Sequence, residues 1–118
     1  MQHVSQIKHK LGISGVLTNV YSWSAKADPV YGAGAQIDML IERADNVVNI
    51  CEMKFSKNEY VIDKKYSQNL AHKVGRLLQT TKTRKTLHLT MITVNGVAHN
   101  EYWGEVQSEV VADDLFHK

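Results

Sequence analysis

The spacing of hydrophobic positions predicts two main helices. Val4, Ile7 and Leu11 recur at helical intervals, so we expect a short helix over residues 2–11. Gly12 follows the last of these positions and is a typical C-terminal stop. The first helix is therefore brief and ends before the first strand begins.

A second, longer helix is predicted from Asp63 to about Thr81. Asp63 is a good N-cap, because its carboxylate can accept a hydrogen bond from a free amide of the first turn. The apolar stripe of this helix consists of Tyr66, Leu70, Val74, Leu77 and Leu78. A terminal helical turn is expected over Ala112 to Phe116.

Segments rich in β-branched and aromatic residues predict the strands. They lie at residues 13–24, 36–43, 47–55 and 86–94, with an edge strand at 105–111. Residues 25–34 contain Asp28-Pro29 and two glycines, which is typical of a loop. Only Ala44-Asp45-Asn46 separates the second strand from the third, so this pair is predicted to form an antiparallel hairpin.

The predicted order of elements is α-β-β-β-α-β, with an extra strand near the end. A helix between the third and fourth strands implies a right-handed crossover, which sets those two strands parallel. The fourth strand, residues 86–94, has few polar positions, so we expect it to be buried on both faces. The sequence thus predicts an α/β fold with a mixed sheet flanked by helices, as a single domain over residues 1–118.

Composition narrows the class of protein. The hydrophobic share of 43% and the charged share of 22% are typical of a globular domain. No segment approaches the ~18 consecutive apolar residues of a membrane span, and the first residues lack the apolar core of a signal peptide. Cys51 is the single cysteine, which excludes a disulfide framework and a cysteine-rich zinc site. These absences favour a reducing, cytoplasmic setting and no membrane partner.

Basic residues concentrate in the middle of the chain. Residues 54–85 carry nine basic and two acidic side chains, a net charge of +7, whereas the two flanking segments together carry −5. A basic stretch of this kind can bind phosphates even though the whole chain is only weakly basic. Helical lysines more often form a solvated face, and charge alone favours that interpretation.

Asp38 and Glu52 are predicted to face each other across the hairpin. The turn is centred on Asp45, and each carboxylate lies seven residues from it. Side chains alternate along a strand, so Gln36 shares the face of Asp38, and Lys54 shares the face of Glu52. Cross-strand neighbours have Cβ atoms roughly 4.5–5.5 Å apart. Two carboxylates at that separation repel unless a cation or a shared proton lies between them.

Such a pair suits a hard divalent cation, Mg²⁺ or Mn²⁺, which prefers oxygen ligands. Asp38 and Glu52 would be the side-chain ligands, and the backbone carbonyl of Met53 would supply a further oxygen. Lys54 would position the attacking water or stabilise the pentavalent phosphorus. The open alternative is an exposed carboxylate–lysine salt bridge, which is the more frequent role of this pattern taken alone.

The pattern of Asp38 followed by Glu52-Met53-Lys54 resembles the PD-(D/E)XK nuclease superfamily. The core of that superfamily, a restriction-endonuclease-like fold, is α-β-β-β-α-β, with an aspartate on the second strand and (Asp/Glu)-x-Lys on the third. The resemblance implies catalytic roles for Asp38, Glu52 and Lys54. It makes Gln36, on the face of Asp38, an accessory candidate.

The likeness is closest to the C-terminal nuclease-like domain of bacterial AAA-type ATPases. It rests on Gly34-Ala-Gln-Ile-Asp-Met-Leu-Ile-Glu-Arg, Asn49-Ile-Cys-Glu-Met-Lys-Phe-Ser and Lys85-Thr-Leu-His-Leu-Thr-Met-Ile-Thr. In that branch the domain follows an ATPase module, and nothing here resembles a Walker A loop. Many superfamily members also carry a glutamate on the first helix, whereas residues 1–11 contain no acid. This departure leaves open whether the domain lacks an N-terminal portion.

Three polar residues of the long helix follow the Glu-x-Lys strand. In several superfamily branches this helix lends a polar residue to the site, for which Tyr66, Gln68 and Lys73 are the candidates. The interpretation we favour places Tyr66 in the core, and Gln68 and Lys73 in solvent.

The resemblance implies a metal-dependent, endonuclease-like hydrolase that binds DNA and cleaves its phosphodiesters. The alternative is a catalytically decayed DNA-binding or interaction module, a remnant or accessory of an AAA-type ATPase. A domain that forms a homodimer through exposed strands is a third open interpretation.

Overall fold

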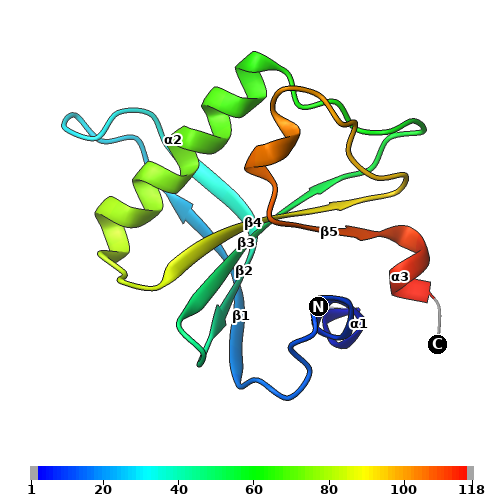
Figure 1. The fold of residues 1–118 in the computed structure, drawn as a ribbon. Helices are drawn as coiled ribbons and strands as arrows, with labels where there is room; N and C mark the ends of the chain where they lie inside the picture. The colour runs from blue at the N-terminus through cyan, green and yellow to red at the C-terminus, as the bar shows by residue number, and fades with distance from the viewer. Residues whose placement is uncertain (1–2, 117–118) are drawn as a thin grey trace.

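The computed structural model describes residues 3–116 and confirms the predicted α/β architecture, a mixed sheet flanked by helices (Figure 1). The strands are β1 (Thr18–Ala25), β2 (Ala35–Arg43), β3 (Val47–Lys54), β4 (Thr86–Thr93) and β5 (Ser108–Val111). The helices are α1 (Val4–Lys10), α2 (Lys64–Thr81) and α3 (Ala112–Phe116), with a 3₁₀ turn at Trp103–Glu105. The order from α1 to β4 is the predicted α-β-β-β-α-β core.

The five strands lie in the order β1-β2-β3-β4-β5. Strands β1, β2 and β3 pair antiparallel, whereas β3, β4 and β5 pair parallel. Helix α2 connects β3 to β4, so these two strands are parallel as expected from a crossover. The buried half of β4, from Leu89 to Thr93, agrees with the prediction that this strand is covered on both faces.

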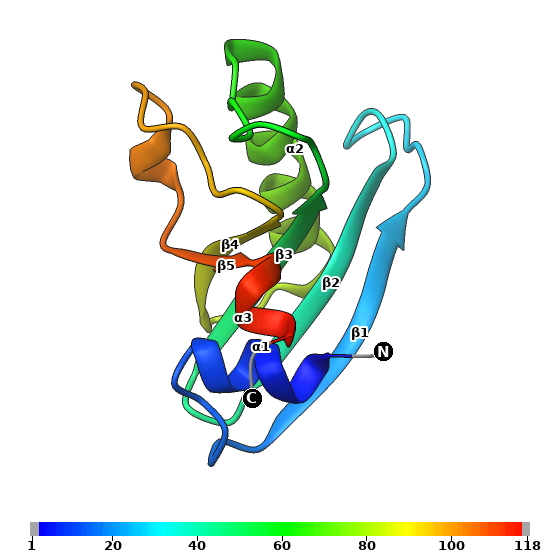
Figure 2. The same ribbon diagram turned by 90° about the vertical axis from the view of Figure 1, so that its right-hand side faces the viewer.

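Helices cover both faces of the sheet. On one face α2 contributes Leu70 and Leu77 to a buried cluster with Ile50 of β3. On the other face α1 and α3 lie beside each other (Figure 2), and Ile7 packs in a cluster with Cys51. No helix within residues 3–116 is long and apolar enough to cross a membrane.

Strand β1 begins later than predicted, at Thr18. Residues 13–17 form a turn instead, in which the Val16 amide donates a hydrogen bond to the Ile13 carbonyl at 2.9 Å. Gly12 leads into this turn with a φ of +74°, which favours glycine. Ile13 is buried although it is outside the sheet, which explains why the segment resembles a strand in sequence.

The other boundaries differ by a few residues. The predicted edge strand at 105–111 is reduced to Ser108–Val111, because Trp103–Glu105 forms the 3₁₀ turn. Its position at the edge of the sheet is confirmed. Residue 2, which the first predicted helix includes, lies outside the described residues.

Two local features that position the site follow the predicted chemistry. Asp63 caps α2, and its Oδ1 accepts a hydrogen bond from the Tyr66 amide at 2.7 Å. In the β2–β3 hairpin Met39 pairs with Cys51, which is the register centred on Asp45. The hairpin register on which the candidate site depends is therefore confirmed.

Candidate functional site

The candidate site lies at the open end of the β2–β3 hairpin, where β3 approaches α2. The regular pairing of the two strands extends only to Met39 and Cys51. Beyond it, Glu52 Oε2 accepts a hydrogen bond from the Asp38 amide at 3.2 Å. Asp38 Oδ2 accepts one from the Met53 amide at 2.9 Å. Each carboxylate thus accepts a backbone amide from the opposite strand. Both lie where the regular pairing of β2 with β3 has ended, and we call this opening between the two strands the gap.

Asp38 lies in a β-bulge of β2. The pairing of β1 with β2 shifts register between Tyr21 and Trp23, so Ser22 alone faces both Asp38 and Met39. A bulge adds one residue to a strand, bends it and redirects the side chains at that point. The strict alternation that we predicted for β2 is therefore interrupted at the candidate ligand itself.

Glu52 is a buried carboxylate, with only 1% of the residue exposed. Its Oε1 atom forms an ion pair with Lys73 of α2 and accepts a hydrogen bond from the Tyr66 hydroxyl at 3.3 Å. Burying a charge costs several kcal/mol unless it is paired and hydrogen-bonded, and these two contacts from α2 provide that compensation. Burial, with Glu52 nearby, raises the pKa of Tyr66 well above its usual value, so this hydroxyl stays protonated and acts as a donor.

The position of Lys73 differs from the sequence prediction. We expected it in solvent, but its side chain is 17% exposed and bonded to Glu52. Gln68 is exposed as expected. The signal that could have identified Lys73 is its spacing from Tyr66, since residues seven apart lie two turns along the same helix face.

Lys54 lies on the same face of β3 as Glu52 but makes a different contact. Its Nζ atom is 4.8 Å from the centroid of the Tyr66 ring and 6.0 Å from that of Tyr60. These distances are those of cation–π contacts. Within residues 3–116, the Lys54 side chain makes no hydrogen bond or ion pair, so its ammonium group is available to an incoming anion.

The oxygen donors fit a hard divalent cation. Asp38 Oδ1 has no hydrogen-bond partner among the described residues. The amide and carbonyl of one strand residue point to the same side, so the Met53 carbonyl faces the gap into which its amide points. No cluster of three His, Cys, Asp or Glu side chains occurs within residues 3–116. Mg²⁺ nevertheless needs only one or two carboxylates, because it keeps several waters.

Gln36, the accessory candidate, is exposed. It makes no hydrogen bond with Asp38 or Glu52 in the part of the chain that the structure describes. The structure therefore places Gln36 on β2, two residues before Asp38, without joining it to the carboxylates.

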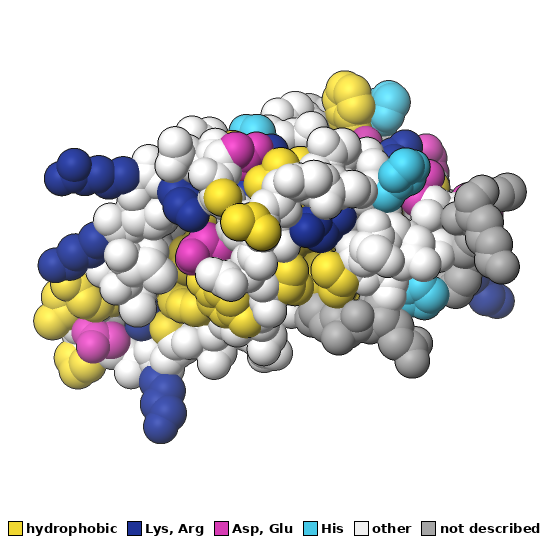
Figure 3. Space-filling model, turned by 90° about the horizontal axis from the view of Figure 1, so that it is seen from below, with side chains coloured by type: hydrophobic (Ala, Val, Ile, Leu, Met, Phe, Trp, Pro, Cys, Tyr) yellow, Lys and Arg dark blue, Asp and Glu magenta, His cyan; other side chains and the backbone are white. Residues whose placement is uncertain are grey.

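The basic middle segment divides into an outward and an inward group. The outward group consists of the exposed residues Lys57, Lys64, Lys65, Lys82 and Arg84. In Figure 3 Lys and Arg side chains project at the left-hand end, the side on which Figure 1 shows the β1–β2 loop. The inward group includes Lys73 and Arg76, which bond to protein groups. The outward group and Lys54 can bind phosphates without rearrangement, because none of their ammonium or guanidinium groups is held in an ion pair among residues 3–116.

Arg76 fastens the loop between β1 and β2 to α2. The residue is 5% exposed, and its guanidinium donates to the carbonyls of Ala33 and Lys26. His72 Nε2 lies 2.9 Å from the same Ala33 oxygen. Because this loop leads directly into the strand that carries Asp38, one helix positions both sides of the candidate site.

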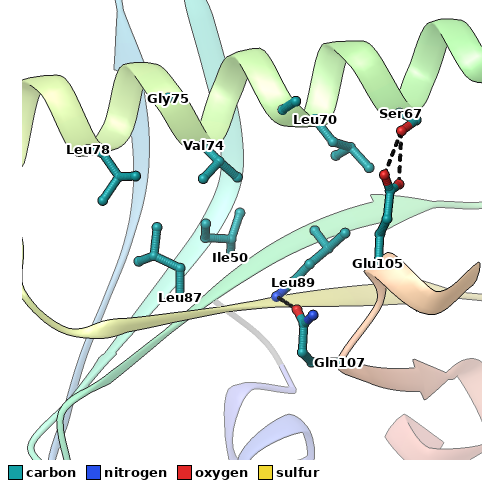
Figure 4. Close-up of a pocket in the computed structure, with 11 residues that line it drawn as sticks. Ile50, Ser67, Leu70, Val74, Gly75, Leu78, Leu87, Leu89, Glu105 and Gln107 are labelled. Atoms are coloured by element: carbon teal, nitrogen blue, oxygen red, sulfur yellow. Dashed lines mark hydrogen bonds between the residues drawn. The ribbon is translucent and has the colours of Figure 1, made fainter. Parts of the chain in front are cut away.

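A separate apolar cavity of about 390 Å³ lies between α2 and the sheet (Figure 4). Its apolar lining includes Leu70, Val74, Leu78, Ile50, Leu87 and Leu89. At one end Ser67 donates to the Glu105 carboxylate at 2.8 Å. None of Asp38, Glu52 and Lys54 lines this cavity, so it is distinct from the candidate site.

Comparison with known proteins identifies the fold without a family. No family model and no curated protein matches the chain. A crystal structure described as "Protein of Unknown Function AF1548" is similar, with a TM-score of 0.52 and 19% sequence identity over 88% of this chain. The match covers 53% of that protein, so this chain spans about half its length. At this identity the likeness shows the shared α/β fold alone.

Proposed function

We propose that the protein is a metal-dependent nuclease that hydrolyses DNA phosphodiesters, as a member of the PD-(D/E)XK superfamily. The observation that carries this proposal is the meeting of the Asp38 and Glu52 carboxylates at one gap, with the unpaired ammonium of Lys54 on the face of Glu52. This combination provides oxygen ligands for a cation and a positive charge for a phosphate.

Each residue has a distinct role in this proposal. Asp38, Glu52 and the Met53 carbonyl would hold Mg²⁺ or Mn²⁺, which when bound acidifies a water and neutralises phosphate charge. Lys54 stabilises the charge that develops on the phosphorus oxygens, because its ammonium is not neutralised by a carboxylate. The outward basic group holds the DNA backbone, which contributes affinity but does not read bases.

A second candidate function is a DNA-binding or interaction module that has lost catalysis. The ion pair between Lys73 and Glu52 favours it, because a lysine already compensates the carboxylate that a metal would need. In this form the domain would act as an accessory of an AAA-type ATPase or as a homodimer.

A cleavage assay with matched variants tests the first proposal. Supercoiled, linear duplex and single-stranded DNA are incubated with Mg²⁺ or Mn²⁺ and with wild type, Asp38→Asn, Glu52→Gln or Lys57→Met. Lys57→Met removes one charge of the outward group and leaves the carboxylates intact, so it should bind DNA more weakly but still nick it when the protein is in excess. Metal-dependent nicking that both carboxylate variants abolish supports the nuclease. DNA binding without nicking and without calorimetric Mn²⁺ binding supports the second candidate.

A further inference from the structure

We propose that Lys73 is an internal cation that competes with a divalent metal for the Glu52 carboxylate. This inference rests on the metal site of the proposed function and adds a control element to it. Metal binding at Glu52 would require the Lys73 ammonium to break its ion pair with this carboxylate. A phosphate of the substrate would then be the new partner of the ammonium.

The contacts of Glu52 fill one carboxylate oxygen and half of the other, because each oxygen can accept two bonds. Oε1 is bonded to the Lys73 ammonium and to the Tyr66 hydroxyl. Oε2 accepts the Asp38 amide. A cation at Oε1 must therefore replace a donor, and a cation at the remaining position of Oε2 shares the carboxylate with the Lys73 ammonium. Lys73 is the one donor of the three that carries a charge of its own.

Electrostatics makes the two cations exclusive at Oε1. Like charges a few ångströms apart in a poorly solvated site repel strongly, and Glu52 is 1% exposed. Lys73 also cannot be lost without replacement, because an unpaired carboxylate buried to this extent is costly. A divalent cation satisfies the same carboxylate, so exchange of one cation for the other keeps the charge of Glu52 compensated.

Lys73 has a way out of the site. Its side chain is 17% exposed, so part of its flexible stem is in contact with solvent. A lysine ammonium can rotate to a new anion with little change in the helix backbone. Among the described residues, the Lys54 ammonium contacts aromatic rings and no carboxylate. A phosphate bound at this edge would therefore meet two lysines, one of them freed by the metal.

This exchange predicts that metal and DNA assist each other. A phosphate that attracts Lys73 weakens its hold on Glu52 and thereby raises the affinity for metal. By linkage, metal raises the affinity for DNA by the same factor. A purely structural ion pair between β3 and α2 predicts no such coupling.

Calorimetry with Mn²⁺ alone, on full-length protein without DNA, tests the exchange. The variants are Lys73→Met, which keeps the stem and removes the charge, and Lys65→Met, a control that removes an exposed charge from the same helix. We expect Lys73→Met to bind Mn²⁺ about tenfold more tightly than wild type, a typical coupling between sites. Lys65→Met should bind Mn²⁺ like wild type, because the proposed ligand of the outward group, DNA, is absent from this measurement. Equal Mn²⁺ affinity of Lys73→Met and Lys65→Met would overturn the proposal.

Thermal unfolding provides a second readout. Without metal Lys73→Met should melt below wild type, and saturating Mn²⁺ should raise its Tm more than that of wild type. Equal shifts in the two proteins contradict the exchange. If Lys73→Met does not fold, Lys73→Gln is used, because its amide can still donate to Glu52.

Acylation of Lys73 in wild type, followed by mass spectrometry, tests the same point without a substitution. Mn²⁺ should increase the acylation of Lys73, because it frees the ammonium group from Glu52. Unchanged acylation refutes the exchange.

The outcomes separate this inference from the nuclease proposal. If wild type neither binds Mn²⁺ nor cleaves DNA but Lys73→Met binds Mn²⁺, the nuclease proposal fails and Lys73 is confirmed as the competing cation. If wild type binds metal and cleaves DNA while Lys73→Met binds no more tightly, the nuclease stands and the inference fails.

Discussion

The carboxylates of Asp38 and Glu52 hold the ends of β2 and β3 together through each other's backbone. Glu52 accepts the Asp38 amide at 3.2 Å, and Asp38 accepts the Met53 amide at 2.9 Å. Both proposed metal ligands therefore also stabilise the hairpin. Variants at these positions must preserve the hydrogen bonds if the chemistry is to be tested separately from the fold.

Asp38→Asn should separate these two roles. The asparagine carbonyl can still accept the Met53 amide, so the free energy of unfolding should change by less than about 1 kcal/mol. Metal affinity and cleavage should fall to background, because the neutral amide is a much weaker ligand for Mg²⁺. Urea unfolding and Mn²⁺ calorimetry measure the two effects. Wild-type cleavage by this variant would remove Asp38 from the metal site.

Much of this site could be predicted from the sequence, because the hairpin turn is short. Only residues 44–46 separate the two strands, so the register was determined by a centre at Asp45, and Met39 does pair with Cys51. Local capping chemistry likewise predicted the start of α2 at Asp63. These features depend on neighbours in the chain, which the sequence displays directly.

The features that escaped prediction depend on tertiary contacts. The bulge at Asp38 arises in the pairing with β1, and it puts Ile37 and Leu40, three positions apart, in one cluster beneath α2. A two-residue period does not predict this. Lys73 looked solvated because most helical lysines are, and only the packing of α2 on β3 brings it to Glu52.

A double-mutant cycle should show strong coupling between Glu52 and Lys73. Glu52→Gln and Lys73→Met each leave a charge without its partner, and each should lower the free energy of unfolding by about 3 kcal/mol. The double variant replaces both charges, so its loss should be smaller than the sum by about 2 kcal/mol. Chemical denaturation of the four proteins, without metal, gives the coupling. Additive losses would show that the pair contributes little to stability.

Lys54→Met should reduce catalysis and leave the fold intact. In residues 3–116 the contacts of its ammonium are with the rings of Tyr66 and Tyr60, so the stability change should be about 1 kcal/mol or less. If Lys54 stabilises transition-state charge, the cleavage rate should fall roughly 100-fold to 1000-fold while Mn²⁺ still binds. Single-turnover cleavage beside the Lys57→Met control measures this. A rate equal to that of the control would exclude Lys54 from the chemistry.

Cys51 should make the protein less stable at alkaline pH. The residue is fully buried, and burial, with the nearby Glu52 and Asp38 charges, raises the pKa of its thiol to about 12. The unfolded thiol titrates near about 8.5, so between these two values the unfolded state loses a proton that the folded state keeps. Stability is therefore unaffected below about pH 8.5 and falls by about 1.4 kcal/mol per pH unit above it.

Urea unfolding of wild type and Cys51→Ala at pH 8 and pH 10.5 isolates this effect from other titrating groups. Wild type should lose more stability than the variant over this interval. The same burial predicts that a thiol reagent modifies Cys51 only after unfolding. Parallel pH curves for the two proteins, or rapid modification of the native thiol, would contradict the prediction.

Arg76→Met should release the loop between β1 and β2 while the sheet stays formed. The arginine donates to the carbonyls of Ala33 and Lys26, and its loss leaves these groups without that donor. Tyr31 in the same loop is 49% exposed, so chymotrypsin should cut there faster in the variant than in wild type. Arg84→Met, at an exposed position, serves as the control and should be cut like wild type. If both variants are cut equally, the loop does not depend on Arg76, and the contact of His72 with the Ala33 carbonyl still joins it to α2.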